Sequence, residues 1–226
     1  VTLRVEPLTP ILEADRSSVE VTAKDSIPTI TVTKEPHSTL QLNVLVKERD
    51  YSYFGSLSDI GLSYDASTGK ITGIPTVVGN HIIYLSTFLD KNFTGVAGGV
   101  RNELTIPLTV TAKEFNFMDN QERHTTVMSA IAPVAVSVPD GIEVSVESGT
   151  LPQGIIYNSD KKVIEGTPTQ AGTFTITMVA NPSGIRGNER KATVTIQVGP
   201  LPATIRIPHN HQTIQVGTPM EPSTIE

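Results

Sequence analysis

The chain has 226 residues, no cysteine, no tryptophan and a formal net charge of −6 at pH 7. This negative charge, with lysines and arginines scattered along the chain, argues against binding to nucleic acid or to an anionic membrane. No stretch reaches the roughly 20 apolar residues that a membrane-spanning helix needs, so we expect no membrane insertion. Hydrophobic residues make up 38% of the chain, which is enough for a folded core.

In chain order, strands are predicted at residues 18–23, 29–33, 40–46, 81–87, 104–110, 131–138, 142–146, 173–179 and 192–198. These runs are rich in β-branched residues, and several alternate apolar and polar side chains with the period of two that strands require. Residues 1–12 are expected to be a linker or an edge strand. The fold class is therefore all-β.

The same stretch occurs twice between these strands. Residues 61–79 read GLSYDASTGKITGIPTVVG and residues 154–172 read GIIYNSDKKVIEGTPTQAG, an ungapped offset of 93 positions. Each copy reads as a short strand, a turn such as Asp65 to Gly69, a second short strand and a break at a proline. The chain is therefore a tandem repeat, with one domain expected at 1–112 and a second at 113–200. Residues 201–226 are a linker, the start of a further repeat or a returning strand.

The repeated stretch carries a family resemblance. Leu151-Pro-Gln-Gly154, Gly166-Thr-Pro-Thr169, Ala171-Gly172 and Phe174 resemble the "putative Ig" and dystroglycan-type cadherin-like modules of bacterial surface proteins, and the first copy keeps Gly61, Tyr64, Ile71, Gly73, Pro75, Thr76 and Gly79. The resemblance implies two tandem Ig-like (cadherin-like) antiparallel β-sandwich domains. It also implies an extracellular place on the bacterial cell surface or cell wall, where such modules commonly do without disulfides.

Residues 47–59 form the first candidate binding loop, being too long and too polar for a hairpin turn. They hold Arg49, Tyr51, Tyr53 and Phe54 in a chain that is only 5% aromatic. Aromatic faces beside charged groups are typical of sugar-binding surfaces, because rings stack on the C–H face of a sugar and charged groups bind its hydroxyls or carboxylate. The alternative is that Tyr51 and Phe54 fill the end of the core.

The second candidate loop spans residues 88–102, before the last strand of the first domain. It contains Phe88, Asp90, Lys91, Asn92 and Arg101, together with a cluster of glycine and alanine at 95–99. Aligning Val110 with Val198 gives an offset of 88 instead of 93, so this loop is five residues longer than its counterpart. Long glycine-rich loops at the end of a sandwich commonly bind ligands.

A second resemblance is to the siglec-like plus unique domain pair of streptococcal serine-rich repeat adhesins, which bind sialylated host glycans. In that family a Thr-Arg pair on the strand after the turn motif holds the sialic-acid carboxylate. Here Thr87 takes the threonine's place, and Phe88 stands where the arginine is expected. Arg101 or Arg49 could supply the guanidinium instead.

Motifs for catalysis and metal binding are few. No nucleophile elbow, zinc-protease motif or phosphate-binding loop is present, so we expect no enzyme. His209 and His211 could chelate a metal from one face of a strand or lie in a solvated turn. Calcium at a domain junction would have to use Asp119 with Asn120, Asp90 with Asn92, or Glu114, and we expect no cofactor.

The sequence thus predicts a fragment of a bacterial cell-surface adhesin that binds a host glycan or glycoprotein, sialylated glycans included, through loops of its first domain. We expect it to be a monomer within a longer chain. The alternative is a structural spacer that holds another adhesive domain away from the cell wall. The longer loops of the first domain favour binding, because a spacer does not need them.

Overall fold

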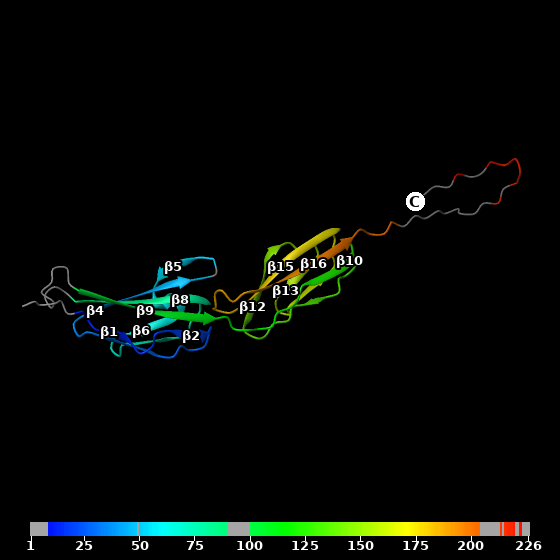
Figure 1. The fold of residues 1–226 in the computed structure, drawn as a ribbon. Coiled ribbons are helices and arrows are strands. Elements are labelled where there is room, and N and C mark those ends of the chain that lie inside the picture. The colour runs from blue at the N-terminus through cyan, green and yellow to red at the C-terminus, as the bar shows by residue number, and fades with distance from the viewer. Residues whose placement is uncertain are drawn as a thin grey trace, which may run out of the picture. The chain divides into compact units, whose positions relative to one another are not determined.

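The computed structural model describes residues 9–48, 50–89 and 100–203, together with 213, 215–219 and 222. The predicted all-β fold is confirmed: the described elements are strands, apart from one turn of 3-10 helix (Figure 1). In chain order the first repeat contains β1 (Leu12–Ala14), β2 (Val19–Thr22), β3 (Ile30–Lys34), β4 (Thr39–Lys47), β5 (Ser52–Gly55), the 3-10 helix η1 (Leu57–Ile60), β6 (Leu62–Asp65), β7 (Lys70–Gly73), β8 (Gly79–Leu89) and β9 (Val100–Thr111).

The second repeat has the same plan with fewer strands. It contains β10 (Gln121–Thr126), β11 (Val134–Ala135), β12 (Ile142–Gly149), β13 (Ile155–Asn158), β14 (Val163–Gly166), β15 (Gly172–Pro182) and β16 (Arg190–Gly199). Its sheets have the orders β10-β16-β15-β12 and β11-β14-β13, whereas those of the first repeat are β2-β9-β8-β4-β5 and β1-β3-β7-β6. A two-sheet sandwich therefore recurs in both repeats.

The sequence analysis predicted antiparallel β-sandwiches, but each repeat also contains one pair of parallel strands. β2 runs parallel to β9, and β10 runs parallel to β16. In each repeat these are an early strand and the last strand, which lie side by side at the edge of the larger sheet. The two strands run in the same direction, so the long connection between them crosses through the rest of the sandwich.

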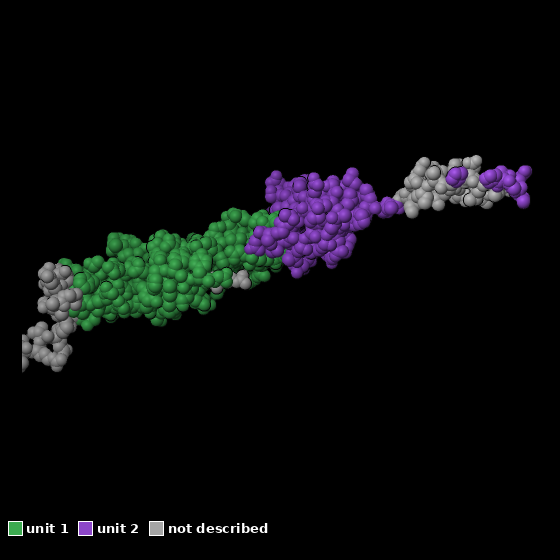
Figure 2. Space-filling model, turned by 90° about the horizontal axis from the view of Figure 1, so that it is seen from above, with its two compact units in different colours: residues 1–118, 137–146, 178–192 green, residues 119–136, 147–177, 193–226 purple. Residues whose placement is uncertain are grey.

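Two compact units make up the chain (Figure 2). Unit 1 comprises residues 1–118, 137–146 and 178–192, and unit 2 comprises residues 119–136, 147–177 and 193–226. Unit 1 thus includes segments that lie in the second sequence repeat. The boundaries 1–112 and 113–200 stay predictions from the repeat.

The core of unit 1 is filled from both sheets by alternating side chains. Ile30, Ile71, Ile83 and Ile106 are all fully buried, at 0% exposure. Ile185 joins the same cluster at 2% exposure, although it lies more than 70 positions beyond β9 in the sequence. Burying such side chains contributes roughly 1.5–3 kcal/mol each, so segment 178–192 helps to stabilise unit 1.

The prediction of a loop at 47–59 was wrong for most of its length. β5 pairs with β4 in register from Val44 opposite Gly55 to Lys47 opposite Ser52. The Ser56 backbone N–H then donates to the Asp59 carboxylate (2.8 Å), which caps the 3-10 helix. The segment folds as a hairpin because β4 offers it an edge with which to pair, an interaction that composition does not show.

Candidate functional site

The outer face of the five-stranded sheet in unit 1 brings several predicted residues together. Along β8, the side chains of Ile83, Leu85 and Thr87 point into the core and are at most 1% exposed. Tyr84 and Phe88 belong to the opposite face, because successive strand side chains alternate. The cross-strand register carries the same alternation onto β4, β5 and β9.

Three aromatic rings lie on this face: Phe54 on β5, and Tyr84 and Phe88 on β8. Phe54 is 69% exposed and Phe88 is 38% exposed, so solvent reaches both rings. The ring centroids of Phe54 and Tyr84 are 5.7 Å apart, with their planes tilted by 57°. Phe88 follows Tyr84 by four strand residues, about 13 Å along the sheet. We call these three rings the aromatic row.

Polar side chains accompany the aromatic row on the same face. Cross-strand pairing puts Asn43 of β4 opposite Tyr84, and Arg101 of β9 opposite Phe88. Arg101 Nη1 lies 3.2 Å from Glu103 Oε1, and the two side chains are 60% and 65% exposed. Since this pair is open to solvent, the guanidinium can exchange its partner for a ligand hydroxyl or carboxylate at little cost.

The β4–β5 hairpin holds Tyr51 and Tyr53 on the face opposite Phe54. Their rings stack with centroids 6.0 Å apart, and Tyr53 packs against the core. The pKa of Tyr51 is raised, chiefly by its hydrogen bond with the Glu48 carboxylate. The predicted cluster is thus split between two faces. The alternative that Tyr51 and Phe54 fill the core is wrong, because they are 55% and 69% exposed.

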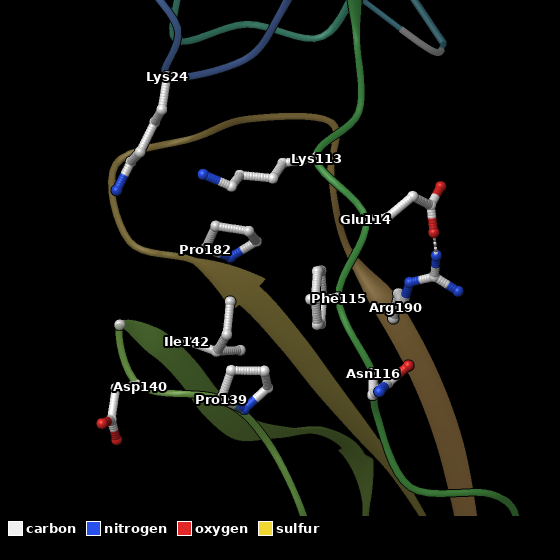
Figure 3. Close-up of a pocket in the computed structure, with 11 residues that line it drawn as sticks. Lys24, Lys113, Glu114, Phe115, Asn116, Pro139, Asp140, Ile142, Pro182 and Arg190 are labelled. Atoms are coloured by element: carbon white, nitrogen blue, oxygen red, sulfur yellow. Dashed lines mark hydrogen bonds and ion pairs between the residues drawn. The ribbon is translucent and has the colours of Figure 1, made fainter.

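A cavity of about 570 Å³ opens within unit 1 (Figure 3). Its apolar wall is made by the Phe115 ring together with Pro139, Ile142 and Pro182. Lys24 and Lys113 also line the cavity. The cavity thus combines a ring, an apolar floor and two cations, none of which the sequence had singled out as a binding site.

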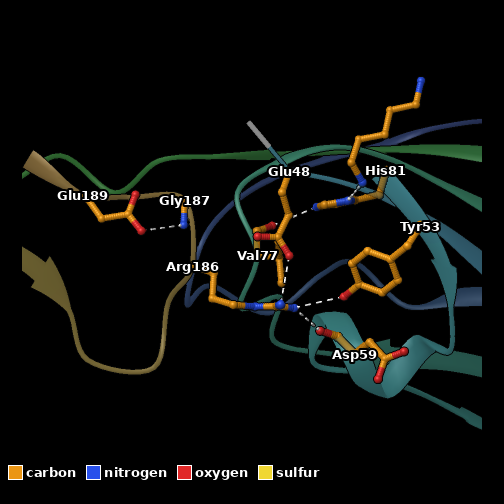
Figure 4. Close-up of polar contacts among 9 residues, drawn as sticks. Glu48, Tyr53, Asp59, Val77, His81, Arg186, Gly187 and Glu189 are labelled. Atoms are coloured by element: carbon orange, nitrogen blue, oxygen red, sulfur yellow. Dashed lines mark hydrogen bonds and ion pairs between the residues drawn. The ribbon is translucent and has the colours of Figure 1, made fainter. Parts of the chain in front are cut away.

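Arg186 forms the centre of a polar cluster within unit 1 (Figure 4). Its guanidinium makes an ion pair of 2.8 Å with the Glu48 carboxylate, whose side chain is only 10% exposed. It also donates hydrogen bonds to the Tyr53 hydroxyl (3.3 Å) and to the backbone carbonyl of Asp59 (3.0 Å). These bonds raise the pKa of Arg186, with Tyr53 the largest cause. Tyr53 therefore has a structural partner rather than a free hydroxyl.

The backbone on either side of Arg186 is fixed as well. Its N–H donates to the Thr76 carbonyl (2.9 Å), and its carbonyl accepts from the Val78 N–H (2.9 Å). Val77 forms an isolated parallel bridge with Arg186 and is fully buried. Residues 76–78, which lie just before the last glycine of the first repeated stretch, therefore gain a short β pairing from residue 186.

His81 supports the same region from inside the core. Its Nδ1 accepts a hydrogen bond from the Lys47 N–H (3.1 Å), and its Nε2 lies 2.9 Å from the Val77 carbonyl, to which it donates. This arrangement requires the neutral ring, and burial lowers the pKa of His81. His81 is 1% exposed, so it is a structural residue and not a ligand-binding group.

The other predicted site residues do not join the aromatic row. Thr87 is fully buried and its hydroxyl has no partner within the described residues, so a ligand does not reach it in this structure. Arg49, Asp90, Lys91 and Asn92 lie outside the described residues. Among the residues that are described, no group of three or more His, Cys, Asp or Glu side chains could hold a metal ion.

Sequence reasoning missed Tyr84, Asn43 and Arg186. The alternation along 81–87 could have placed Tyr84 on one face with Phe88, because the two are separated by an even number of residues. Asn43 needed the register of β4 with β8, and Arg186 needed a contact across more than 120 residues, so no local pattern could have shown them.

A protein-family model described as "Putative Ig domain" matches residues 105–199. Among curated proteins, the "Serine-rich adhesin for platelets" of Staphylococcus aureus is 32% identical over 141 residues, covering 61% of this chain and 6% of that protein. The protein of the same name from strain MRSA252 is 31% identical, with 61% and 10% covered. The chain thus spans a small part of these relatives. Together the matches support a bacterial surface Ig-like module of adhesin type and an extracellular location.

Solved structures with a related arrangement include the human desmocollin-1 ectodomain, at a TM-score of 0.31 and 12% identity, covering 89% of this chain and 44% of that one. The titin fragment I67–I69 has a TM-score of 0.31 and 12% identity, with 87% and 67% covered. The Ig-like and adhesin matches suggest a non-enzymatic adhesive or structural module. In the part of the chain that is described, no helix is long and apolar enough to cross a membrane.

Proposed function

We propose that this chain is a module of a bacterial cell-surface adhesin that binds a host glycan on the outer sheet face of unit 1. The observation that carries the proposal is the aromatic row, Phe54, Tyr84 and Phe88, which two strands hold on a solvent-exposed face. Folding gains little from an exposed ring, since a side chain stabilises the fold mainly by leaving water. Phe54, at 69% exposure, is therefore better explained by a ligand than by packing.

The chemistry of the face suits a sugar. Aromatic faces stack on the C–H face of a pyranose, and the distance of about 13 Å between Tyr84 and Phe88 along the strand leaves room for an oligosaccharide. Asn43 can donate to and accept from hydroxyl groups, and Arg101 can bind a hydroxyl or a carboxylate. Asp90, Lys91 and Asn92 follow Phe88 and Leu89 in the chain and stay predicted contributors. A sialylated glycan would present its carboxylate to Arg101.

The test is a glycan array probed with the 226-residue chain and with the double variant Phe54→Ala/Phe88→Ala. We expect selective binding to one glycan class, weakened at least about tenfold in the variant, because truncating aromatic anchors commonly costs more than 1.4 kcal/mol. The matched control is Ile156→Ala, which truncates a 59% exposed apolar side chain on β13. No binding to any glycan, or equal binding by the double variant and by the control, would refute the proposed site.

A second candidate, the structural spacer, is favoured by a different observation. Ile185 and Arg186 come from the second sequence repeat, yet they lie in the core and in the polar cluster of unit 1. A spacer benefits when one repeat supplies part of the fold of another, because the chain then resists local opening. If the chain is a spacer, it should bind no glycan on the array, and Arg186→Ala should speed proteolytic cleavage within residues 183–189.

A further inference from the structure

We infer that the cavity of unit 1 next to Lys24, Lys113 and Phe115 is a second binding site, whose ligand is a sugar acid: a pyranose ring that carries a carboxylate. The cavity measures about 570 Å³, within the range of roughly 300–1,000 Å³ that is typical of small-molecule sites. It uses none of the residues of the aromatic row. The inference therefore stands or falls separately from the proposed function.

The charges around the cavity are unbalanced in favour of cations. Three cations, Lys24, Lys113 and Arg190, and two carboxylates, Glu114 and Asp140, line it, in a chain whose net charge is −6. Glu114 is already paired with Arg190. Neither lysine makes an ion pair with any residue that the structure describes, so two ammonium groups are free to bind an anion.

The fold does not require lysine at either position, as the second repeat shows. Lys24 and Met128 occupy equivalent positions, each with a positive φ (69° and 66°). The Lys24 N–H donates to the Pro75 carbonyl, and the Met128 N–H donates to the Pro168 carbonyl. Lys113 corresponds to Leu201 at the same offset of 88 that aligns Val110 with Val198. Since the same local backbone accepts methionine, the charge at position 24 is not explained by folding.

The apolar wall supplies a seat for a ring. Arg190 lies over Phe115, with its guanidinium carbon 5.5 Å from the ring centroid. The ring stands between Arg190 on one side and Ile142 and Pro182 on the other (Figure 3). The first face is therefore occupied, and the second is turned to the cavity, where it can stack on the C–H face of a sugar. The Asn116 amide and the Asp140 carboxylate also line the cavity and can bind hydroxyls.

The backbone beneath these groups is held in place. The buried Asn188 side chain donates to the Lys113 carbonyl (3.1 Å), and the Ser183 N–H donates to the Gly141 carbonyl (3.1 Å). A Cβ built on Gly141 would meet no atom within 4 Å, so this rim is open. A cavity whose backbone is already fixed loses less conformational entropy on binding, which favours a small ligand.

The test is an NMR titration of the ¹⁵N-labelled 226-residue chain at constant ionic strength. The ligands are N-acetylneuraminic acid methyl glycoside, glucuronic acid, galactose and sodium acetate. We expect at least one of the two sugar acids to shift the amides of residues 113–116 and 140–142, with galactose and acetate at least about tenfold weaker, since each lacks one half of the recognised chemistry. The acid that binds more tightly identifies the kind of sugar.

The variants use the residues of the other repeat. Lys24→Met/Lys113→Leu should retain the fold and weaken the sugar acid about tenfold or more, whereas Lys70→Met removes an exposed lysine elsewhere and should leave the affinity unchanged. Phe54→Ala, which alters the aromatic row, should also leave these shifts unchanged. The inference is overturned if neither acid shifts these amides, if acetate or galactose binds equally well, or if Lys70→Met weakens binding as much as the double variant.

Discussion

The two copies of the repeated stretch share a backbone but differ in what surrounds them. Gly61, Gly73 and Gly79 have φ of 80°, 140° and 150°, and the equivalent Gly154, Gly166 and Gly172 have 92°, 137° and 147°. In both copies the residue after the second short strand donates to the carbonyl of the first glycine, at 3.1 Å and 3.0 Å. The local sequence therefore specifies the turns and short strands in the same way twice.

The two copies differ in the three residues before their last glycine, residues 76–78 and 169–171, which we call their exits. Residues 76–78 pair with Arg186, and Val77 is fully buried. The equivalent residues 169–171 are all exposed, and position 77 has become Gln170. The comparison teaches that the motif encodes its own turns, while the packing of its exit comes from a segment far away in the sequence.

The largest expected effect comes from the last glycine of each copy. In Gly79→Ala the new Cβ would overlap the backbone carbonyl oxygen of Lys47, whereas in Gly172→Ala it would lie 3.3 Å from the movable Phe174 ring. Both substitutions incur the cost of a positive φ, about 1–3 kcal/mol, and only the first adds a backbone clash. We expect Gly79→Ala to destabilise unit 1 by more than about 3 kcal/mol and Gly172→Ala to cost unit 2 about half as much.

Urea unfolding followed by the NMR amide signals of each unit measures both free energies in one sample. Gly199→Ala is the control, since a Cβ there meets its nearest atom at an ordinary 3.6 Å. An equal loss of unfolding free energy in Gly79→Ala and Gly172→Ala would mean that the two exits are not different environments.

Next in size is the loss of Ile185, the buried apolar side chain that precedes Arg186 in the sequence. Ile185→Ala removes a 2% exposed side chain from the core of unit 1, which should cost about 2–4 kcal/mol. Ile156→Ala removes the same atoms from a 59% exposed position and should cost less than about 0.5 kcal/mol. Thermal unfolding of both variants is the measurement. A small effect of Ile185→Ala would mean that segment 178–192 contributes little to unit 1.

Arg186→Ala should have a smaller effect, about 1–2 kcal/mol. It leaves the Glu48 carboxylate, 10% exposed, without its cation, but the arginine itself is 47% exposed and water can enter. Lys161→Ala breaks a comparable pair with Glu165 in the second repeat, where the side chains are 66% and 33% exposed, and should cost less than about 0.5 kcal/mol. Unfolding in urea at low and at high salt compares the two, and an Arg186→Ala loss no larger than that of Lys161→Ala would contradict the assigned cluster.

The sequence predicts the features that depend on neighbouring residues and misses those that depend on contacts between distant segments. Most of the strands, the two repeated stretches and the turn at Asp65 could be predicted, because propensity and turn chemistry act over a few residues. Of the strand predicted at 131–138 only Val134–Ala135 forms, and β10 (Gln121–Thr126) was not predicted. β5 was not, since Ser52–Gly55 becomes a strand only through register with β4. In the candidate site, Phe54, Phe88 and Arg101 could be named from residue type, but their common face depends on how four strands align. The bonds of Arg186 required the folded chain.

The smallest expected effect is a pH dependence that one unit has and the other lacks. His81 of the first copy is replaced by Phe174 in the second, and each ring lies 3.3 Å from the position of a Cβ on the glycine two residues earlier. Burial lowers the pKa of His81 below its ordinary value of 6.5 in the folded chain. Below pH 6.5 His81 therefore binds a proton more readily in the unfolded chain than in the folded chain. As a result, the free energy of unfolding of unit 1 falls as the pH falls toward the folded-state pKa of His81.

Above pH 6.5 the contribution of His81 is fully present. Urea unfolding of unit 1 between pH 7.5 and pH 5, followed by its own amide signals, measures how its free energy of unfolding changes with pH. This slope should vanish in His81→Gln, a folded variant with an uncharged side chain at position 81. Protonated His81 could no longer accept from the Lys47 N–H, so the amide of Lys47 should be the first of its strand to exchange faster with solvent. An unchanged slope in His81→Gln would assign the pH dependence to carboxylates instead, and the difference between the two copies would then be one of packing alone.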